Sequence, residues 1–240
     1  MQNIYKTIRS KSYSVSCELC RIGPSICIPK LLNNALDTVV NCKHAVSKDE
    51  IIVNEGTALD RFYIINAGAL KTYITVEGKE QINGFYLPGD IIGLDSIHSL
   101  KYNCSVKALT NSLICELKYE ELMTLVSQNT HVRDTLFKLM SEDIHDFKKL
   151  ILCFSQKNAE ERVGMFIYSL YSKYARRGHV SLNIKLSMSR NDIANYLGLT
   201  IETISRILTR MQDLNILTAR GKYITIKNLP ALIKFAEYHK

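Results

Sequence analysis

The spacing of hydrophobic and polar positions changes once along this chain, near Thr130. Before that point, short apolar or β-branched runs alternate with turns, and six of the eleven glycines lie between Gly56 and Gly93. Short strands with glycine turns at such intervals are typical of an antiparallel sandwich or jelly roll. We expect strands over residues 61–66, 70–76, 81–87, 105–109 and 113–117.

After Thr130 the apolar positions follow a helical period. Five of them are spaced 3, 4, 3, 4, as in the a/d seam of a two-stranded coiled coil: Phe137, Met140, Ile144, Phe147 and Ile151. A long helix buried in its own chain has the same period. Val132, Leu136 and Leu139 lie on another flank, which we expect to pack on the β-domain.

Residues 190–209 fit the spacing of a DNA-binding helix-turn-helix. Ala194 is small where two helices approach closely, Gly198 stands where the chain must turn, and Ile204 lies on the buried side of the second helix. Further apolar contacts are expected from Ile193, Leu197, Leu199 and Ile207. The exposed face would present Thr200, Glu202, Thr203, Ser205, Arg206 and Arg210 to a major groove. An ordinary helical hairpin seldom combines all these features.

The segments around this motif predict a winged helix-turn-helix. We expect a helix over 158–175 and an extended segment over 180–188 before the motif, and a hairpin of 216–219 and 223–226 after it. Arg220 and Lys222 flank the hairpin turn and are the expected phosphate contacts. Because such modules read paired half-sites as dimers, the apolar seam is expected to be a dimer interface.

Charge is distributed unevenly along the chain. Residues 158–240 hold 13 Lys and Arg against 6 Asp and Glu, whereas residues 1–157 hold 18 against 17. A basic third beside a neutral remainder indicates that the C-terminal domain meets a polyanion. No segment approaches the length of a membrane-spanning helix, and the N-terminus lacks the apolar core of a secretory signal, so we expect a cytoplasmic protein. No set of nucleophile, base and orienting group indicates an enzyme.

The cysteines distinguish this chain from other helix-turn-helix proteins. It contains seven: Cys17, Cys20, Cys27, Cys42, Cys104, Cys115 and Cys153. An odd number in a cytoplasmic chain argues against a disulfide framework. Three lie within eleven residues on a segment bent by Gly23-Pro24, and closely spaced thiolates suit zinc or an iron–sulfur cluster. Either would need a fourth ligand from elsewhere.

With these motifs the chain resembles the CRP/FNR family of transcription regulators, especially its oxygen-responsive, FNR-type members. The likeness runs from Cys17 to Lys227 and is strongest in residues 157–162, 196–200, 202–206 and 221–226. It implies a [4Fe–4S] cluster held by Cys17, Cys20, Cys27 and Cys115, with Cys104 a weaker candidate for the fourth ligand. Six residues separate Cys20 from Cys27, where FNR-type proteins have five or seven.

The resemblance also implies partners. A homodimer would read an inverted repeat of TTGAT half-sites through Glu202, Ser205 and Arg206, and would contact RNA polymerase through a surface loop such as residues 77–80. Cyclic-nucleotide-binding relatives carry a Gly-Glu pair and a downstream arginine. This chain instead reads Gly89-Asp90 and then Asn103-Cys104-Ser105-Val106, so no cyclic nucleotide is expected.

The expected fold class is α+β. A cysteine-rich cluster-binding segment (1–30) would precede an antiparallel β-roll or jelly roll like that of cyclic-nucleotide-binding domains (31–128). A long dimerisation helix (129–156) and a winged helix-turn-helix (157–240) would follow. The chain would act as an oxygen-responsive DNA-binding regulator. The alternative is a cluster-free or zinc-structured regulator of the same family that responds to another signal.

Overall fold

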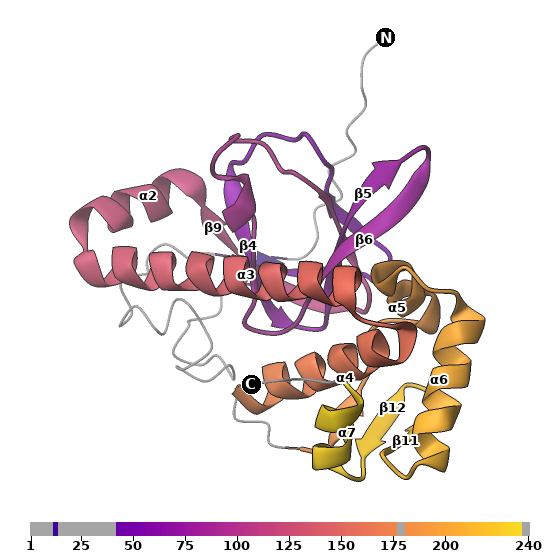
Figure 1. The fold of residues 1–240 in the computed structure, drawn as a ribbon. Coiled ribbons are helices and arrows are strands. Elements are labelled where there is room, and N and C mark those ends of the chain that lie inside the picture. Colours follow the sequence, from indigo (N-terminus) through magenta and orange to yellow (C-terminus); the bar gives the residue numbers. More distant parts are fainter. Residues whose placement is uncertain (1–11, 14–41, 177–180, 237–240) are drawn as a thin grey trace. The chain divides into compact units, whose positions relative to one another are not determined.

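The computed structural model describes residues 12–13, 42–176 and 181–236 (Figure 1). Cys17, Cys20 and Cys27 lie outside these residues. The described chain forms two compact units: the first extends to Leu136, and the second begins at Phe137 and also includes the hairpin tip Thr75–Gly84. No helix in the described part is long and apolar enough to cross a membrane.

The first unit is built on two sheets, with strand orders β1-β2-β9-β4-β7 and β3-β8-β5-β6. The strands are β1 (Ser12–Tyr13), β2 (Cys42–Val46), β3 (Ile51–Val53), β4 (Arg61–Ala67), β5 (Leu70–Val76), β6 (Lys79–Tyr86), β7 (Ile91–Ile92), β8 (Ser105–Ala108) and β9 (Ser112–Lys118). The pairs β2–β9, β4–β9 and β5–β8 are antiparallel. Apolar side chains of β4 and β9, including Phe62, Ile65 and Leu117, are fully buried in the core.

The five predicted strands correspond to β4, β5, β6, β8 and β9, with ends that differ by at most two residues. The predicted α+β class, with an antiparallel β-roll followed by a long helix and a winged helix-turn-helix, is confirmed. The short strands β3 and β7 were not predicted, because two or three residues are too few to show an alternating pattern.

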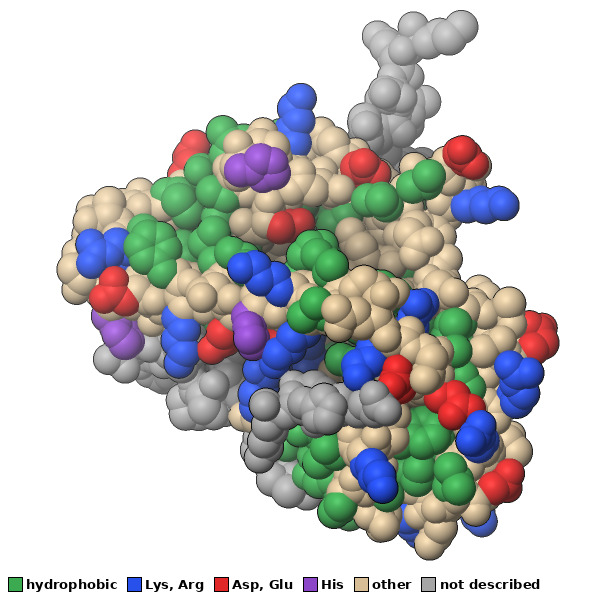
Figure 2. All heavy atoms as spheres, viewed as in Figure 1, with side chains coloured by type: hydrophobic (Ala, Val, Ile, Leu, Met, Phe, Trp, Pro, Cys, Tyr) green, Lys and Arg blue, Asp and Glu red, His purple; other side chains and the backbone are tan. Residues whose placement is uncertain are grey.

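Two helices follow the sheets, α2 (Tyr119–Gln128) and α3 (Thr130–Gln156). Val132 and Leu136 of α3 are buried, as predicted for the flank that packs within the first unit. By contrast, four of the five seam side chains are at least half exposed: Phe137, Ile144, Phe147 and Ile151. The alternative of a helix buried in its own chain therefore does not account for this stripe. Hydrophobic side chains reach the surface between charged ones along the middle of Figure 2, where α3 runs.

The second unit continues with α4 (Ala159–Arg176), β10 (Asn183–Lys185), α5 (Arg190–Leu197), α6 (Ile201–Asp213), β11 (Leu217–Arg220), β12 (Tyr223–Ile226) and α7 (Leu229–Phe235). Its core consists of apolar side chains from α4, α5 and α6, such as Ile167, Leu197 and Met211. Three strands in the order β10-β12-β11 complete the domain.

The turn between β4 and β5 depends on Gly68. Its φ is +89°, and a Cβ there would lie 2.2 Å from Ser112 Oγ and 2.7 Å from Ser112 Cα. Residues other than glycine are disfavoured at such a φ. The contact with Ser112 includes its backbone Cα, which cannot rotate away as a side chain could. Gly56 has a similar φ of +80° but nothing within 4 Å of its Cβ position.

Gly68→Ala is expected to lower the free energy of unfolding by about 2–4 kcal/mol, from backbone strain and overpacking together. Gly56→Ala is the matched control and should cost only about 1–2 kcal/mol, because it has the strain without the clash. Urea unfolding followed by circular dichroism measures both. Equal losses for the two variants would show that the approach to Ser112 is unimportant.

Candidate nucleic-acid interface

The first helix of the helix-turn-helix, α5, is fixed at both ends by local interactions. Ser189 and Asp192 form a capping box: Ser189 N–H donates to Asp192 Oδ2 at 2.9 Å, and Asp192 N–H donates to Ser189 Oγ at 3.0 Å. Gly198 ends the helix with φ 64° and ψ 38°, a left-handed conformation that suits glycine. Ala194 is buried, as predicted for the close approach of the two helices.

The second helix, α6, is capped by Thr200, whose hydroxyl accepts from Thr203 N–H at 3.2 Å. Ile204 and Ile207 are buried, as predicted, and Leu208 and Met211 lie with them in the core. Because this strongly apolar side is held inside the domain, the opposite side of α6 is fixed toward solvent.

The exposed side of α6 carries the predicted base-reading residues. Glu202, Ser205 and Arg206 are all exposed, and their spacing of 3 and 1 places them on one face near the helix start. Hydrogen bonds from its own backbone N–H and from the Thr200 hydroxyl lower the pKa of the Glu202 carboxyl. Glu202 is therefore ionised at neutral pH and can accept from the amino group of cytosine, while Arg206 can donate to guanine.

The predicted wing is present directly behind α6. Strands β11 and β12 pair with Arg220 opposite Tyr223, and Gly221 with φ 58° makes the turn. Arg220 and Lys222 are exposed at this tip. Strand β10 pairs with the other edge of β12, and Leu186 N–H donates to Lys222 O at 2.7 Å. Two cations are thus presented on a supported hairpin, an arrangement suited to phosphate contact.

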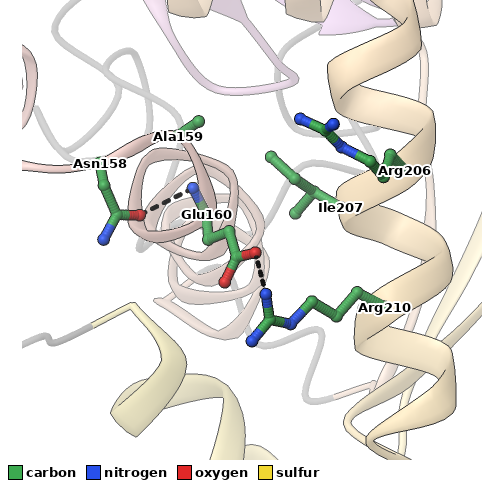
Figure 3. A pocket seen from close by; sticks show the side chains of 6 residues that line it. All are labelled: Asn158, Ala159, Glu160, Arg206, Ile207 and Arg210. Atoms are coloured by element: carbon green, nitrogen blue, oxygen red, sulfur yellow. Dashed lines mark hydrogen bonds and ion pairs between the residues drawn. The ribbon is translucent and has the colours of Figure 1, made fainter.

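Arg210, a predicted DNA-contacting residue, pairs with an acidic side chain that the sequence analysis did not predict. Its guanidinium Nη1 lies 2.6 Å from Glu160 Oε1, on the first turn of α4. Figure 3 shows Arg206 and Arg210 extending from α6 toward that turn, with Glu160 reaching back to Arg210. The space between them is a pocket of about 510 Å³ lined by Asn158, Ala159, Glu160, Arg206, Ile207 and Arg210. The sequence showed Arg206 and Arg210 four residues apart, but not their acidic neighbour.

The start of α4 is held by a second capping box. Asn158 Oδ1 accepts from the N–H groups of Glu160 and Glu161, and Asn158 N–H donates to Glu161 Oε2 at 2.8 Å. The neighbouring Arg162 donates to Phe154 O at 2.8 Å and to Lys157 O at 3.0 Å, which are carbonyls at the end of α3. The first turn of α4, including Glu160, therefore has a fixed position beside α6.

The structure describes Cys115 and Cys104, the two candidates for the fourth cluster ligand. Cys115 lies on β9 opposite Ile64 and is buried, as are Cys104 and Cys153; none of these three is in a disulfide. Within the described residues, no group of three or more His, Cys, Asp or Glu side chains is placed to hold a metal ion. Cys104, Cys115 and Cys153 therefore do not form a metal site with one another or with the other described residues.

Two polar side chains of the β-roll, Asp90 and Ser105, make local hydrogen bonds with the backbone. Asp90 Oδ2 accepts from Leu87 N–H at 2.8 Å and closes the turn at Pro88-Gly89. Ser105 Oγ accepts from Glu55 N–H at 2.9 Å. Both side chains stabilise loops of the β-roll.

Comparisons with known proteins agree with this architecture. Residues 43–129 match the cyclic nucleotide-binding domain family, and residues 161–235 match the Crp-like helix-turn-helix domain family. The chain is 41% identical to the fumarate and nitrate reduction regulatory protein of Yersinia pestis, covering 98% of this chain and 96% of that protein. The anaerobic regulatory protein of Pasteurella multocida is 39% identical, covering 97% of this chain and 87% of the relative.

A solved structure shows the same fold. That of FixK2 from Bradyrhizobium japonicum is 28% identical with a TM-score of 0.76, covering 82% of this chain and 98% of that one. With two adjoining domains of this type and about 40% identity to full-length relatives, the chain belongs to the CRP/FNR family of DNA-binding transcription regulators.

Proposed function

We propose that this protein is an oxygen-responsive transcription regulator that dimerises while it holds a [4Fe–4S] cluster and then binds an inverted repeat of TTGAT half-sites. The observation that carries this proposal is the full-length similarity to proteins named for anaerobic regulation, in a chain that keeps three closely spaced N-terminal cysteines. Its role is regulatory rather than enzymatic, and its place is the cytoplasm, where the DNA is.

We assign the cluster to Cys17, Cys20, Cys27 and Cys115. Four thiolates are the donor set that an iron–sulfur cluster takes, and Cys115 is held on a central strand of the larger sheet. Burial raises the pKa of the Cys153 thiol, and we leave Cys153 out of the ligand set because the family resemblance gives it no role. When bound, the cluster supplies an oxygen-labile link between the N-terminal segment and the β-roll.

The exposed seam of α3 is the surface that this link controls. Its five members are Phe137, Met140, Ile144, Phe147 and Ile151. An apolar stripe that is at least half exposed at four of these five positions in one chain is suited to pair with the same stripe of a second copy. The cluster acts as the ligand that favours the paired state, and its loss to oxygen returns the protein to the unpaired state.

The paired state presents two copies of α6 to successive turns of DNA. Glu202, Ser205 and Arg206 read bases, and Thr200, Arg210, Arg220 and Lys222 lie where the backbone passes. The hairpin tip of residues 77–80, where Glu77 and Gly78 both have positive φ, is charged and is exposed at residues 77–79, and it is the proposed contact with RNA polymerase. No cyclic nucleotide takes part.

Replacement of a cluster ligand should remove the sulfide-to-iron absorption of anaerobically purified protein. Cys17→Ser, Cys20→Ser, Cys27→Ser and Cys115→Ser are each expected to lose it, because serine is a poor replacement for a thiolate. Cys42→Ser and Cys153→Ser are the controls and should keep it. Full iron and acid-labile sulfide in Cys115→Ser protein would move the fourth ligand to Cys104.

Phe147→Asp should convert the anaerobic dimer to monomer and prevent promoter binding. The substitution removes from each protomer an aromatic ring that pairing would bury and introduces two carboxylates, a loss of about 3–6 kcal/mol for the dimer. His145→Asp adds the same charge away from the seam and should leave the dimer intact. Sedimentation of the two variants decides; an unchanged dimer in Phe147→Asp would show that the seam is not the interface.

Arg206→Ala and Lys222→Ala should affect DNA binding differently. Loss of Arg206 should remove about 1–3 kcal/mol of preference for the guanine-bearing site. Loss of Lys222 should weaken all sequences alike and lower the salt slope by about one. Binding titrations at several salt concentrations separate the two effects. If Arg206→Ala keeps its site preference and loses only overall affinity, Arg206 is a phosphate contact.

A further inference from the structure

The pair of Glu160 and Arg210 lies at the edge of the proposed DNA-binding face. Arg210 Nη1 and Glu160 Oε1 are 2.6 Å apart, with 61% of the Arg210 side chain and 34% of the Glu160 side chain exposed. Arg206 and Arg210 are four residues apart on α6, so they occupy the same side of the helix on successive turns. Arg210 is farther from the helix start, where base edges are read, and therefore nearer to the flanking backbone.

All but one of the side chains discussed at this pocket are of kinds that suit contact with a DNA backbone. Two guanidiniums, from Arg206 and Arg210, face it together with the apolar side chains of Ala159 and Ile207 (Figure 3). Guanidiniums bind phosphate, and small apolar side chains can pack against a sugar. The exception is the Glu160 carboxylate, which would repel any phosphate that enters.

Glu160 is held in this position by the start of its own helix. Its N–H donates to Asn158 Oδ1 at 2.9 Å, and the capping box formed by Asn158 and Glu161 fixes the first turn of α4. These bonds fix the backbone of Glu160 and so keep its carboxylate within reach of Arg210. DNA that binds Arg210 must therefore replace one anion by another.

We propose that Glu160 competes with the DNA backbone for Arg210 and thereby reduces the affinity of this protein for any duplex. The inference rests on the proposed function at DNA and adds a regulating residue to it. A phosphate that takes Arg210 from Glu160 gains one cation but leaves a carboxylate without its partner beside it. The competition is independent of base sequence, so discrimination is left to the residues at the start of α6.

The test is Glu160→Gln in the full-length, anaerobically purified protein. The amide keeps the shape of the side chain and can still accept a hydrogen bond from Arg210, but it does not repel phosphate. One more effective phosphate contact per protomer should steepen the slope of log K against log salt by about 0.9. If the variant and the wild-type protein bind equally at 1 M salt, this slope makes the variant bind about fivefold more tightly per protomer at 0.15 M salt. The gain should be the same for a TTGAT duplex and an unrelated duplex.

Two further variants test whether Glu160 acts through Arg210 rather than through net charge. Glu120→Gln makes the same change of net charge at an exposed position of α2, outside the DNA-binding domain, and should give a much smaller change of slope. In an Arg210→Gln background, Glu160→Gln should give no gain, because the cation for which the two anions compete has been removed.

An unchanged salt slope in Glu160→Gln, with or without a lower melting temperature, would show that the pair only supports the fold and would overturn the inference. A gain that persists in the Arg210→Gln background would also overturn it. If the wild-type protein bound neither duplex without oxygen, the proposed function itself would fail. Binding by wild type with no effect of Glu160→Gln would contradict this inference alone.

Discussion

The hydrogen bonds of Arg162 connect the two halves of the proposed switch. Its guanidinium donates to the carbonyl of Phe154 in the last turn of α3 and to that of Lys157 just after the helix, while its backbone belongs to α4. Helix ends leave such carbonyls without helical partners, and a cation is favoured there. With the Asn158–Glu161 capping box beside it, this contact makes the junction a fixed corner. Pairing along α3 can therefore place α4, and the α6 that packs on it, in a defined orientation.

The charged residues of the DNA-binding domain have different roles in the proposed function. In the proposed function, cations at the wing and along α6 would supply affinity, and the ionised Glu202 would supply a base contact that an overall basic surface could not. Glu160 opposes the cations from the first turn of α4. Because a regulator must release non-specific DNA to find its sites, limited electrostatic affinity is consistent with this function.

The sequence was sufficient for features that depend on local chemistry. Gly198 marked the turn correctly because glycine adopts the left-handed conformation without steric cost, and Ile204 and Ile207 marked the buried side of α6. Helix α2 (Tyr119–Gln128) was missed because it follows β9 without a break, and α7 (Leu229–Phe235) is too short for a clear period, although Asn228 and Pro230 form a recognisable start. The contact of Glu160 with Arg210 joins residues 50 positions apart, which no local pattern reports.

The central claim is that one cluster controls both pairing and DNA binding. It is tested most directly by exposing a single anaerobic sample to air while recording its visible absorption, its sedimentation and its binding to a TTGAT inverted repeat. We expect the three signals to decline together, with iron and sulfide released as the dimer becomes monomer. A dimer that keeps its DNA affinity after the absorption has disappeared, or a protein that never contains iron and sulfide, would contradict the claim.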